Sequence, residues 1–492
     1  MFDRIKSLLF ENRSSRQTFT KNVFWLTVAN VVNRLIRAVL IIYAARVLGV
    51  AGYGIFSYAV GLAAFFSIFS DVGVTAVLTR EGSKNTGSLK KYFTTALTIK
   101  VSLITLSAAL IVFVSPFFTN IKEALPLLPI AALLITFDSL RDISFSLTRA
   151  WEKMELEAII GLVTNTAITV LGIVALLLHP TAKVFLFGYS LGSGVGLIYA
   201  IYVLRNSFPH FWGRFDFSIA KEILTEALPL AIMGLMGSLM ISTDTIILGF
   251  FKNATDLGLY SAAQRPVMIL YALPSILSTA IFPGMTRLAQ NNIERFRAVL
   301  ETSLIATFII SLPLFLGGVI LAPDMIGILF GSEYSGAVLT YGILLFTLVL
   351  IFPENFLTNS IFALGGQKSF LKFALIGVLG NALLDILLIP KFGIAGSAVA
   401  TVITGIIITA LLWKTANKLS PFKIFNRLSK IFSAVIIMSI ATALLKWIGI
   451  PFLVNIPLSA ILYSLTLYWF KEPVLEEFLI PLKRLKAKPI EQ

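Results

Sequence analysis

Fourteen long apolar runs follow one another along the chain, and they constrain its fold more than any other feature. An α-helix rises about 1.5 Å per residue, so about 20 apolar residues cross the roughly 30 Å hydrocarbon core of a bilayer. Only 13% of the residues are charged and 57% are hydrophobic, whereas soluble domains average about 25% charged residues. We therefore predict an all-α polytopic membrane protein. The expected spans are 23–46, 53–78, 92–118, 124–148, 156–178, 182–204, 223–250, 259–283, 298–322, 337–363, 370–390, 393–413, 428–448 and 451–470.

The lysine and arginine residues outside these spans fall mostly on one side of the membrane. Placing both termini on the same side assigns 29 of these cations to that side and 6 to the opposite side. Cytoplasmic loops of membrane proteins carry an excess of Lys and Arg. We therefore expect a multi-pass protein of the cytoplasmic membrane with both termini in the cytoplasm. This topology also accounts for the formal net charge of +15, so no nucleic-acid partner is expected.

Metal-ligating side chains are scarce in this sequence. The chain contains no cysteine and only two histidines, His179 and His210, both in predicted loops. Disulfides and thiolate ligands are therefore excluded, and a zinc site is not expected because thiolate and imidazole are its usual ligands. We expect no cofactor, apart from a coupling ion considered below.

The predicted spans group into two lobes separated by the longest cytoplasmic connection. This connection mixes aromatic and basic residues, which predicts an amphipathic segment at the membrane interface. The expected order is a basic cytoplasmic tail (1–22), an N-lobe of six spans (23–204), the linker (205–222), a C-lobe of six spans (223–413), two extra helices (414–470) and a second basic cytoplasmic tail (471–492).

The two lobes share a short sequence repeat. The stretch AGYGIFSYAVGLAAFF (51–66) recurs as TDLGLYSAAQRPVMIL (255–270) at a constant offset of 204 residues, which pairs Gly54 with Gly258. Both copies lie at the start of the second span of their lobe. Parallel repeats related by a pseudo-two-fold axis are a recurring plan of transporters, with substrate bound between the repeats near the membrane midplane. We predict two pseudo-symmetric six-helix lobes around a central cavity, plus two C-terminal helices.

Two glycine-rich motifs suggest a family. The stretches ARVLGVAGYGIFSYA (45–59) and KFGIAGSAVATVI (391–403), with the basic tail and the fourteen spans, resemble the multidrug/oligosaccharidyl-lipid/polysaccharide (MOP) exporter superfamily. Within it, the chain most resembles the polysaccharide flippases of the Wzx type, over roughly residues 20–490. The resemblance implies a transporter, not an enzyme, that turns polyprenyl-diphosphate-linked oligosaccharide across the membrane by alternating access. It implies lipid-linked oligosaccharide and membrane lipids as partners, with a polysaccharide polymerase or ligase as further candidates, and we expect a monomer.

Cations inside the spans are the strongest candidates for substrate contacts. Asn30, Asn33, Arg34 and Arg37 recur at spacings of three and four, so they share one helix face. Such a face should line a water-filled cavity, where the planar fork of arginine binds phosphate oxygens bidentately. The predicted set for the diphosphate and the cavity is Asn30, Asn33, Arg34, Arg37, Arg141 and Arg265.

Intramembrane ion pairs are the alternative reading of these cations. Arg34 or Arg37 could pair with Asp71 or Asp138, while Arg141 stands three residues after Asp138 and next to Asp142. Arg265 is near the external end of its span, where a long side chain can reach the interface. The same applies to Lys100, in the first third of its span.

The second lobe offers oxygen ligands for a coupling ion. Asn381 and Asp385 are one turn apart, and Thr401 follows on the next predicted helix. Carboxylate, amide and hydroxyl oxygens suit a small alkali cation. The sequence is also similar to the lipid II flippase branch of the superfamily, which implies a sodium site formed by Asp244, Asn381, Asp385 and Thr401. Hydrogen bonding between helices and a proton-coupled Asp385 remain as alternatives.

Three other functions compete with the flippase hypothesis. A multidrug and cation antiporter of the MATE type would favour twelve spans and an acidic or aromatic cavity. A membrane glycan polymerase or ligase would need carboxylate or histidine chemistry on sizeable loops, and the predicted external loops are short. A scaffolding protein would not explain arginines inside the first lobe.

Overall fold

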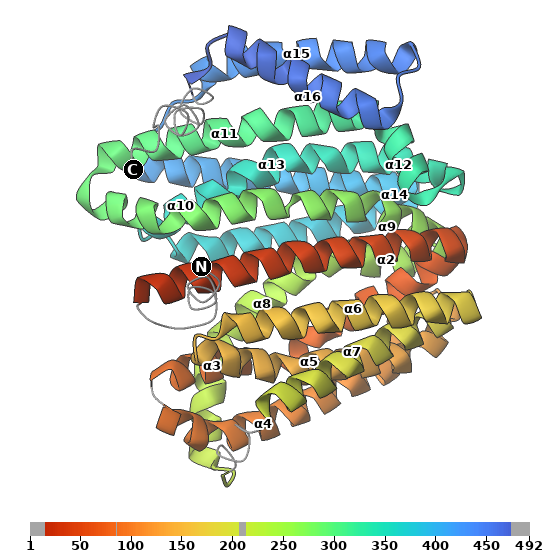
Figure 1. Cartoon of the computed structure of the whole chain (residues 1–492), viewed down its shortest axis with the longest axis vertical. Coiled ribbons are helices and arrows are strands. Elements are labelled where there is room, and N and C mark those ends of the chain that lie inside the picture. The colour runs from red at the N-terminus through yellow and green to blue at the C-terminus, as the bar shows by residue number, and fades with distance from the viewer. Residues whose placement is uncertain (1–14, 85, 206–212, 474–492) are drawn as a thin grey trace, which may run out of the picture. The chain divides into compact units, whose positions relative to one another are not determined.

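The computed structural model describes residues 15–84, 86–205 and 213–473, and these residues are almost entirely helical, without a β-strand. The predicted all-α membrane class is confirmed (Figure 1). The chain separates into two compact units, Met1–Gly258 and Leu259–Gln492. Each unit is described by itself.

Within the described ranges, eleven helices are long and apolar enough to cross a membrane. A bent pair, Ala254–Thr279 with Ile281–Asn291, raises this number to twelve. Two of the eleven, Phe24–Ser70 and Ser369–Leu419, contain 47 and 51 residues. As straight helices they would each be more than about twice as long as the hydrocarbon core is thick. The predicted count of fourteen spans stays a prediction.

Glycines interrupt the helices that contain these two long segments, α2 (Ser15–Phe66) and α14 (Lys368–Leu419). Gly49 has φ 66° and ψ 176°, and Gly393 has φ 60° and ψ −141°. A side chain with a Cβ rarely adopts positive φ, so glycine is the residue that permits these breaks. Gly49 falls between the predicted spans 23–46 and 53–78, and Gly393 is the first residue of the predicted span 393–413.

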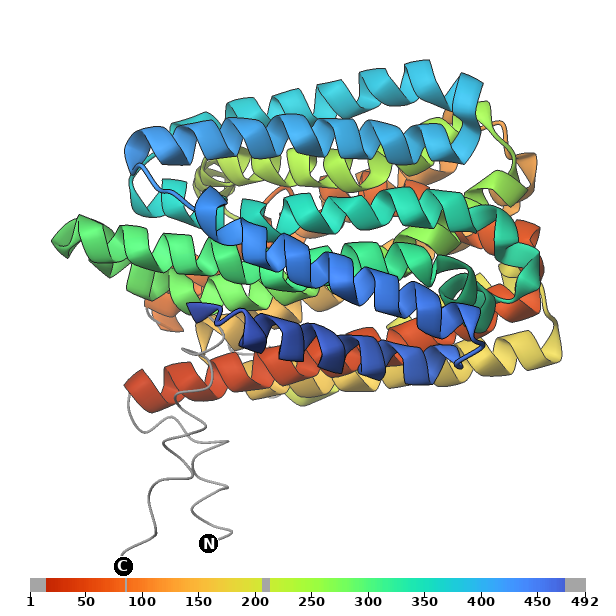
Figure 2. The ribbon, with the colours of Figure 1, turned by 90° about the horizontal axis from the view of Figure 1, so that it is seen from above.

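The chain reverses direction at the break in α14. A Cβ added to Gly396 would lie 2.5 Å from the carbonyl oxygen of Leu388. A continuous helix would separate these two positions by about 12 Å along its axis. The two halves of α14 therefore pack against each other as an antiparallel pair, which is visible in Figure 2.

The first unit is a bundle of helices packed around α2. Helix α2 contacts α5, α6, α7 and α8. The elements are α2, η1 (Ser67–Ser70), α3 (Val74–Lys84), α4 (Thr86–Ala109), the short turns η2 (Leu110–Val114), η3 (Ser115–Phe118) and η4 (Lys122–Leu127), α5 (Leu128–Ala150), α6 (Met154–Leu178), α7 (Ala182–Leu204), α8 (Phe217–Phe251) and the first residues of α9 (Ala254–Leu270).

Helices α6 and α7 pack unusually closely because α7 presents glycines along one face. Gly188, Gly192 and Gly196 are each four residues apart. A Cβ on Gly192 would lie 2.4 Å from the Cα of Ile168, and one on Gly196 would lie 2.2 Å from the Thr164 hydroxyl oxygen. Small residues at such spacing allow helix backbones to approach in membranes.

Helix α8 belongs to the first unit. Its N-cap residue, Asp216, accepts hydrogen bonds from two backbone amides of the first turn and donates its own amide to Thr95 at 3.1 Å. Ile219 and Ile223 join an apolar cluster with α3, α4 and α5. These contacts tie α8 to the helices of the unit Met1–Gly258, and the expected division into lobes at the linker 205–222 stays a prediction. Residues 206–212 of that linker lie outside the described ranges.

The two glycines paired by the sequence repeat lie in the first unit, and each faces the backbone near the other glycine. A Cβ on Gly54 would lie 1.8 Å from the carbonyl oxygen of Ala254. A Cβ on Gly258 would lie 2.0 Å from that of Val50. Backbone approaches backbone at this point, so only glycine fits at either repeat position.

The second unit is organised around α11, which contacts α13 on one side and α15 on another (Figure 1). The two C-terminal helices pack on each other through buried polar groups: Thr442 donates to Ser459 at 2.8 Å, and Ser459 donates to Asn455 at 2.9 Å. The elements are the rest of α9, α10 (Ala272–Asn291), α11 (Ile293–Ile320), α12 (Ala322–Phe330), η6 (Ser332–Ala337), α13 (Val338–Ala363), α14, α15 (Phe425–Trp447) and α16 (Phe452–Trp469).

Candidate functional site

Arg37 on α2 is held by side chains from two other helices of the first unit. Its Nε donates a hydrogen bond to Asn165 Oδ1 on α6 at 3.2 Å, and its guanidinium carbon lies 5.9 Å from the ring centroid of Tyr189 on α7. Asn165 is itself anchored, because its Nδ2 donates to the carbonyl oxygen of Gly161 at 2.8 Å. The predicted polar face of α2 therefore points toward α6 and α7 at this position.

Arg37 forms no ion pair with a carboxylate of the described ranges, since no Asp or Glu there lies at ion-pair distance from its guanidinium. The two carboxylates considered as its alternative partners are taken by other cations: Lys100 binds Asp71 at 3.0 Å, and Arg141 binds Asp138 at 2.7 Å. The alternative of an ion pair at Arg37 is thus not what the fold forms.

Lys100 is fully buried in α4 and does not reach the interface. Its partner Asp71 follows η1 and also accepts a hydrogen bond from the Thr75 hydroxyl at 2.5 Å. A buried cation requires a paired and hydrogen-bonded anion. Lys100 and Asp71 therefore form a structural ion pair between α4 and the start of α3.

Arg141 on α5 is buried, with 9% of its surface exposed. Its two terminal nitrogens bind Asp138 at 2.7 Å and the Ser193 hydroxyl at 3.0 Å, and Ser193 donates to the same Asp138 carboxylate at 2.5 Å. The local ion pair considered for Arg141 is present, with a serine of α7 added to it. Arg141 Nε has no hydrogen-bond partner in the described part of the chain.

A polar cavity of about 140 Å³ lies between α2, α5 and α6. We call it the α2–α6 cavity; its polar wall is formed by Asn30, Asn33, Arg141, Glu157, Thr164 and Asn165. The structure thus brings together three residues of the predicted set, Asn30, Asn33 and Arg141. Arg37 adjoins them through Asn165. Arg34 is exposed and does not line this cavity.

Arg265 and the predicted ion ligands are distributed over both units. Arg265 is exposed on α9 in the second unit, so its participation in phosphate binding stays a prediction. Asp244 is buried in α8 of the first unit. In the second unit Asp385 is fully buried and Asn381 is nearly so, on one face of the first half of α14, while Thr401 follows the break and donates to Ser397 at 3.0 Å. Buried hard oxygens of this kind fit a small cation or a proton.

Sequence reasoning missed the residues that hold the arginines. Asn165 and Ser193 lie on spans whose other residues are mostly apolar, and neither carries a charge. The partners Arg37 and Asn165 are 128 residues apart. The available signal was a single amide inside an apolar span, which in membranes usually indicates a hydrogen bond between helices.

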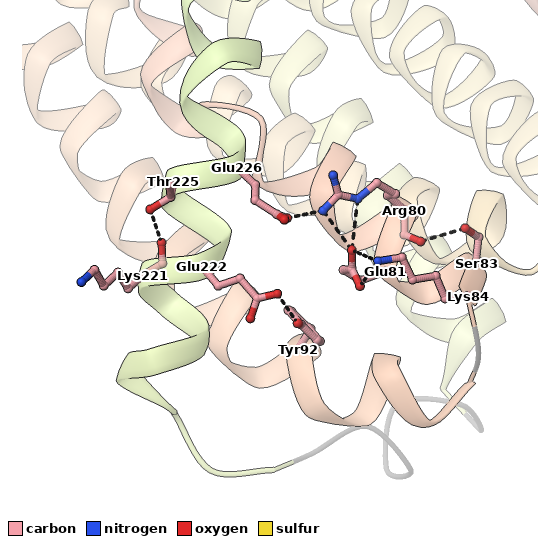
Figure 3. A network of polar contacts seen from close by, with 9 residues as sticks. All are labelled: Arg80, Glu81, Ser83, Lys84, Tyr92, Lys221, Glu222, Thr225 and Glu226. Carbon is pink, nitrogen blue, oxygen red and sulfur yellow. Dashed lines mark hydrogen bonds and ion pairs between the residues drawn. The ribbon is translucent and has the colours of Figure 1, made fainter.

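A second polar network ties α8 to α3 and α4 at the cytoplasmic end predicted from the Lys and Arg distribution (Figure 3). Arg80 on α3 binds Glu226 on α8, and Tyr92 on α4 donates to Glu222 on α8 at 2.6 Å. Glu81 accepts from Lys84 at 2.7 Å and from Arg80 at 3.1 Å. These cations, Lys84 foremost, hold the pKa of Glu81 below its ordinary value. We call this group of residues the α3–α8 clasp.

The amino-acid sequence matches a known protein family and several named relatives. Residues 19–289, more than half of the chain, match the family described as polysaccharide biosynthesis proteins. A protein of Haloferax volcanii named Probable flippase AglR is 25% identical over 386 residues, covering 76% of this chain and 79% of the relative. The succinoglycan biosynthesis transport protein ExoT of Rhizobium meliloti is 21% identical, covering 68% and 67% of the two chains.

Solved structures share the fold. A lipid II flippase MurJ in an inward closed conformation matches with a TM-score of 0.77 and 19% identity, over 91% of this chain and 99% of that one. An inward-facing multidrug resistance MATE transporter matches with a TM-score of 0.64 and 13% identity, over 81% and 98%. The relatives that this chain matches are named as a flippase and a transport protein, and by the match over more than half of its length the chain belongs to the family of polysaccharide biosynthesis proteins.

Proposed function

We propose that this protein carries a polyprenyl-diphosphate-linked oligosaccharide across the cytoplasmic membrane by alternating access. The relatives named for glycan and polysaccharide transport support this substrate class. The observation that carries the proposal is Arg37, an exposed cation within a predicted span that makes no ion pair with a carboxylate in the described ranges.

The chemistry of the proposed substrate matches this arginine. A diphosphate carries roughly two negative charges and cannot cross hydrocarbon unescorted. The bond to Asn165 uses only Nε, so the paired terminal nitrogens of Arg37 keep the geometry that grips phosphate oxygens bidentately. Asn165 contacts Nε of Arg37, and the ring of Tyr189 lies near its guanidinium, so both residues orient the group. The prenyl chain would remain in lipid while the diphosphate contacts Arg37, with Arg34 as a further contact; a contact with Arg265 of the second unit stays a separate prediction.

Exchange of Na⁺ or H⁺ is the proposed energy source. Asn381, Asp385 and Thr401 of the second unit would provide amide, carboxylate and hydroxyl oxygens as ligands, the first two of them buried, and the buried Asp244 of the first unit stays a separate prediction. A buried carboxylate is costly to leave charged without a cation or a proton. Binding and release of the ion would therefore change the relative energies of the conformations used in alternating access.

The proposal is tested by export of a defined surface glycan in a strain that lacks its own flippase. Wild type should restore export, and Arg37→Ala should reduce it by about tenfold or more, since a bidentate charge-assisted contact contributes at least about 1.5 kcal/mol. Arg37→Lys keeps the charge but loses the fork and should fall between the two. Asp385→Asn should abolish the response of export to the ion gradient.

Arg205→Ala serves as the matched control. Arg205 stacks on Tyr202 at 4.0 Å near the end of α7, so the change removes one arginine of the same unit outside the cavity. It should leave export unchanged at equal protein level on an immunoblot. Equal export by Arg37→Ala and wild type would refute the phosphate role, and failure of wild type to restore export of any lipid-linked glycan tested would refute the function.

A further inference from the structure

The α2–α6 cavity is much larger than the space that one bound water occupies, so it can hold a larger chemical group. A single water needs about 10–15 Å³ of such space, and this cavity offers about 140 Å³. Its wall belongs entirely to α2, α5 and α6 of the first unit. Gly161 keeps it open, because a Cβ at this position would lie 3.0 Å from Asn33 Nδ2.

Two hydrogen-bonding groups in the residues of this wall lack partners among the described residues. Arg141, nine-tenths buried, has an unsatisfied donor at Nε, and Asn33 has an unsatisfied buried acceptor at Oδ1. Buried polar groups are nearly always paired in folded proteins. Neither atom is accessible from the cavity in this arrangement, so a ligand group that both accepts and donates, as a hydroxyl group does, would reach them only after the two side chains turn toward it.

The charges of the wall are already balanced. Arg141 is paired with Asp138 at 2.7 Å, and Glu157 is paired with Arg149 through two bonds of 2.6 and 2.8 Å. A site without net charge favours a neutral ligand over a phosphate or carboxylate, because an anion would lose its hydration without gaining an opposite charge. This distinguishes the cavity from Arg37, whose charge is not balanced in this way.

The remaining wall is apolar and includes Phe145, Ala29 and Ala158. A sugar ring combines these requirements, since it carries hydroxyl groups at its rim and C–H groups on its faces. The geometry points to the α2–α6 cavity as a binding site for one neutral pyranose unit of the transported glycan. This inference rests on the proposed function for the identity of the sugar's carrier, and the diphosphate would be bound separately at Arg37.

The absence of cysteine from the chain makes a direct binding test practical. Asn30→Cys places one thiol at the exposed edge of the cavity. The full-length protein in lipid nanodiscs is labelled with methyl methanethiosulfonate in the presence of N-acetylglucosamine, galactose or mannose, and separately with inorganic diphosphate. At least one neutral sugar should slow labelling by threefold or more, and diphosphate should not.

Two variants show where protection arises. Gly161→Ala in the Asn30→Cys background should abolish protection, because its methyl group enters the cavity. Gly172→Ala is the matched control on the same helix: its Cβ would lie 3.1 Å from Phe185, away from the cavity, and protection should persist. Ser83→Cys on α3 should be labelled at the same rate with and without sugar.

The inference is overturned if no neutral sugar protects Asn30→Cys, or if diphosphate protects as well as sugar does. Its failure differs from failure of the proposed function. If the wild-type chain restores glycan export while no sugar protects the thiol, only the pyranose site is refuted. If the wild-type chain does not restore export but a sugar protects the Asn30→Cys thiol, only the flippase function is refuted.

Discussion

At the scale of single residues, the first unit places charge inside an apolar bundle and neutralises most of it locally. Lys100 is matched by Asp71, and Arg141 by Asp138. Arg37 is held instead by an amide and an aromatic ring. Both partners orient the side chain without cancelling its charge. An exposed arginine that is oriented in this way on a helix apolar enough to span the membrane is suited to bind an anion that arrives later.

The repeat glycines make a prediction about stability at the same scale. Gly54→Ala should lower the apparent melting temperature in detergent, because its Cβ would overlap the carbonyl oxygen of Ala254 at 1.8 Å. Overpacking of this kind costs about 1–3 kcal/mol, and backbone contact places it at the upper end. Gly258→Ala should have a similar effect. Thermal unfolding followed by circular dichroism measures both variants.

Gly327→Ala is the control for these variants. A Cβ on this α12 residue meets nothing within 4 Å, so the same substitution should be neutral or slightly stabilising there. If Gly54→Ala and Gly327→Ala melt at the same temperature as wild type, the close backbone approach at the repeat does not exist.

At the scale of helices, polar side chains decide which elements stay together. The glycine face of α7 allows α6 to approach closely, and that approach brings Asn165 to α2 and Ser193 to α5. The α3–α8 clasp joins α3 and α4 to the start of α8, and Pro229 follows farther along that helix. A proline removes one backbone hydrogen bond of a helix. The first turns of α8, which the clasp holds, can therefore unfold or exchange independently of the rest of α8.

The α3–α8 clasp should make the start of α8 sensitive to acid. Because the pKa of Glu81 lies below its ordinary value of 4.5, its contribution is complete above that pH and is lost as pH falls through the lowered pKa. Glu226→Gln removes the other ion pair of Arg80, the one that reaches α8, at neutral pH. Hydrogen exchange of residues 217–227 should accelerate by about threefold, as expected for a surface ion pair.

Lys221→Gln is the matched change for this measurement, since it alters one charge on the same helix but only the Lys221 backbone takes part in the described bonds. It should leave exchange unchanged. Equal exchange in Glu226→Gln and wild type, together with no acceleration in acid, would show that the clasp does not restrain α8.

At the scale of the whole molecule, the Lys and Arg distribution predicts which ends of the helices face the cytoplasm. With single cysteines in a cysteine-free chain, Lys183→Cys and Lys391→Cys should react with a membrane-impermeant maleimide on intact cells. Ser83→Cys and Lys221→Cys should react only after permeabilisation. All four positions are exposed, so burial in protein does not confound the result.

The reaction of Lys391→Cys also tests the count of spans. This residue precedes the break at Gly393, where α14 reverses. If α14 makes two crossings, the residue lies at the external surface. Failure to label it from outside, while Lys183→Cys reacts, would contradict both the reversal at the external surface and the fourteen-span topology.

Local patterns in the sequence determined the all-α membrane class, the paired glycines and the polar face of α2, because apolar length and helical spacing are properties of neighbouring residues. Only the tertiary structure decided that Asp71 pairs with Lys100, that Asn165 receives Arg37, and that α8 joins the first unit. It also decided that Arg34 stays outside the α2–α6 cavity while Arg141 lines it. These outcomes depend on which helices pack together and on how each helix is rotated about its axis. Residues far apart in the sequence have no regular spacing from which this packing could be predicted.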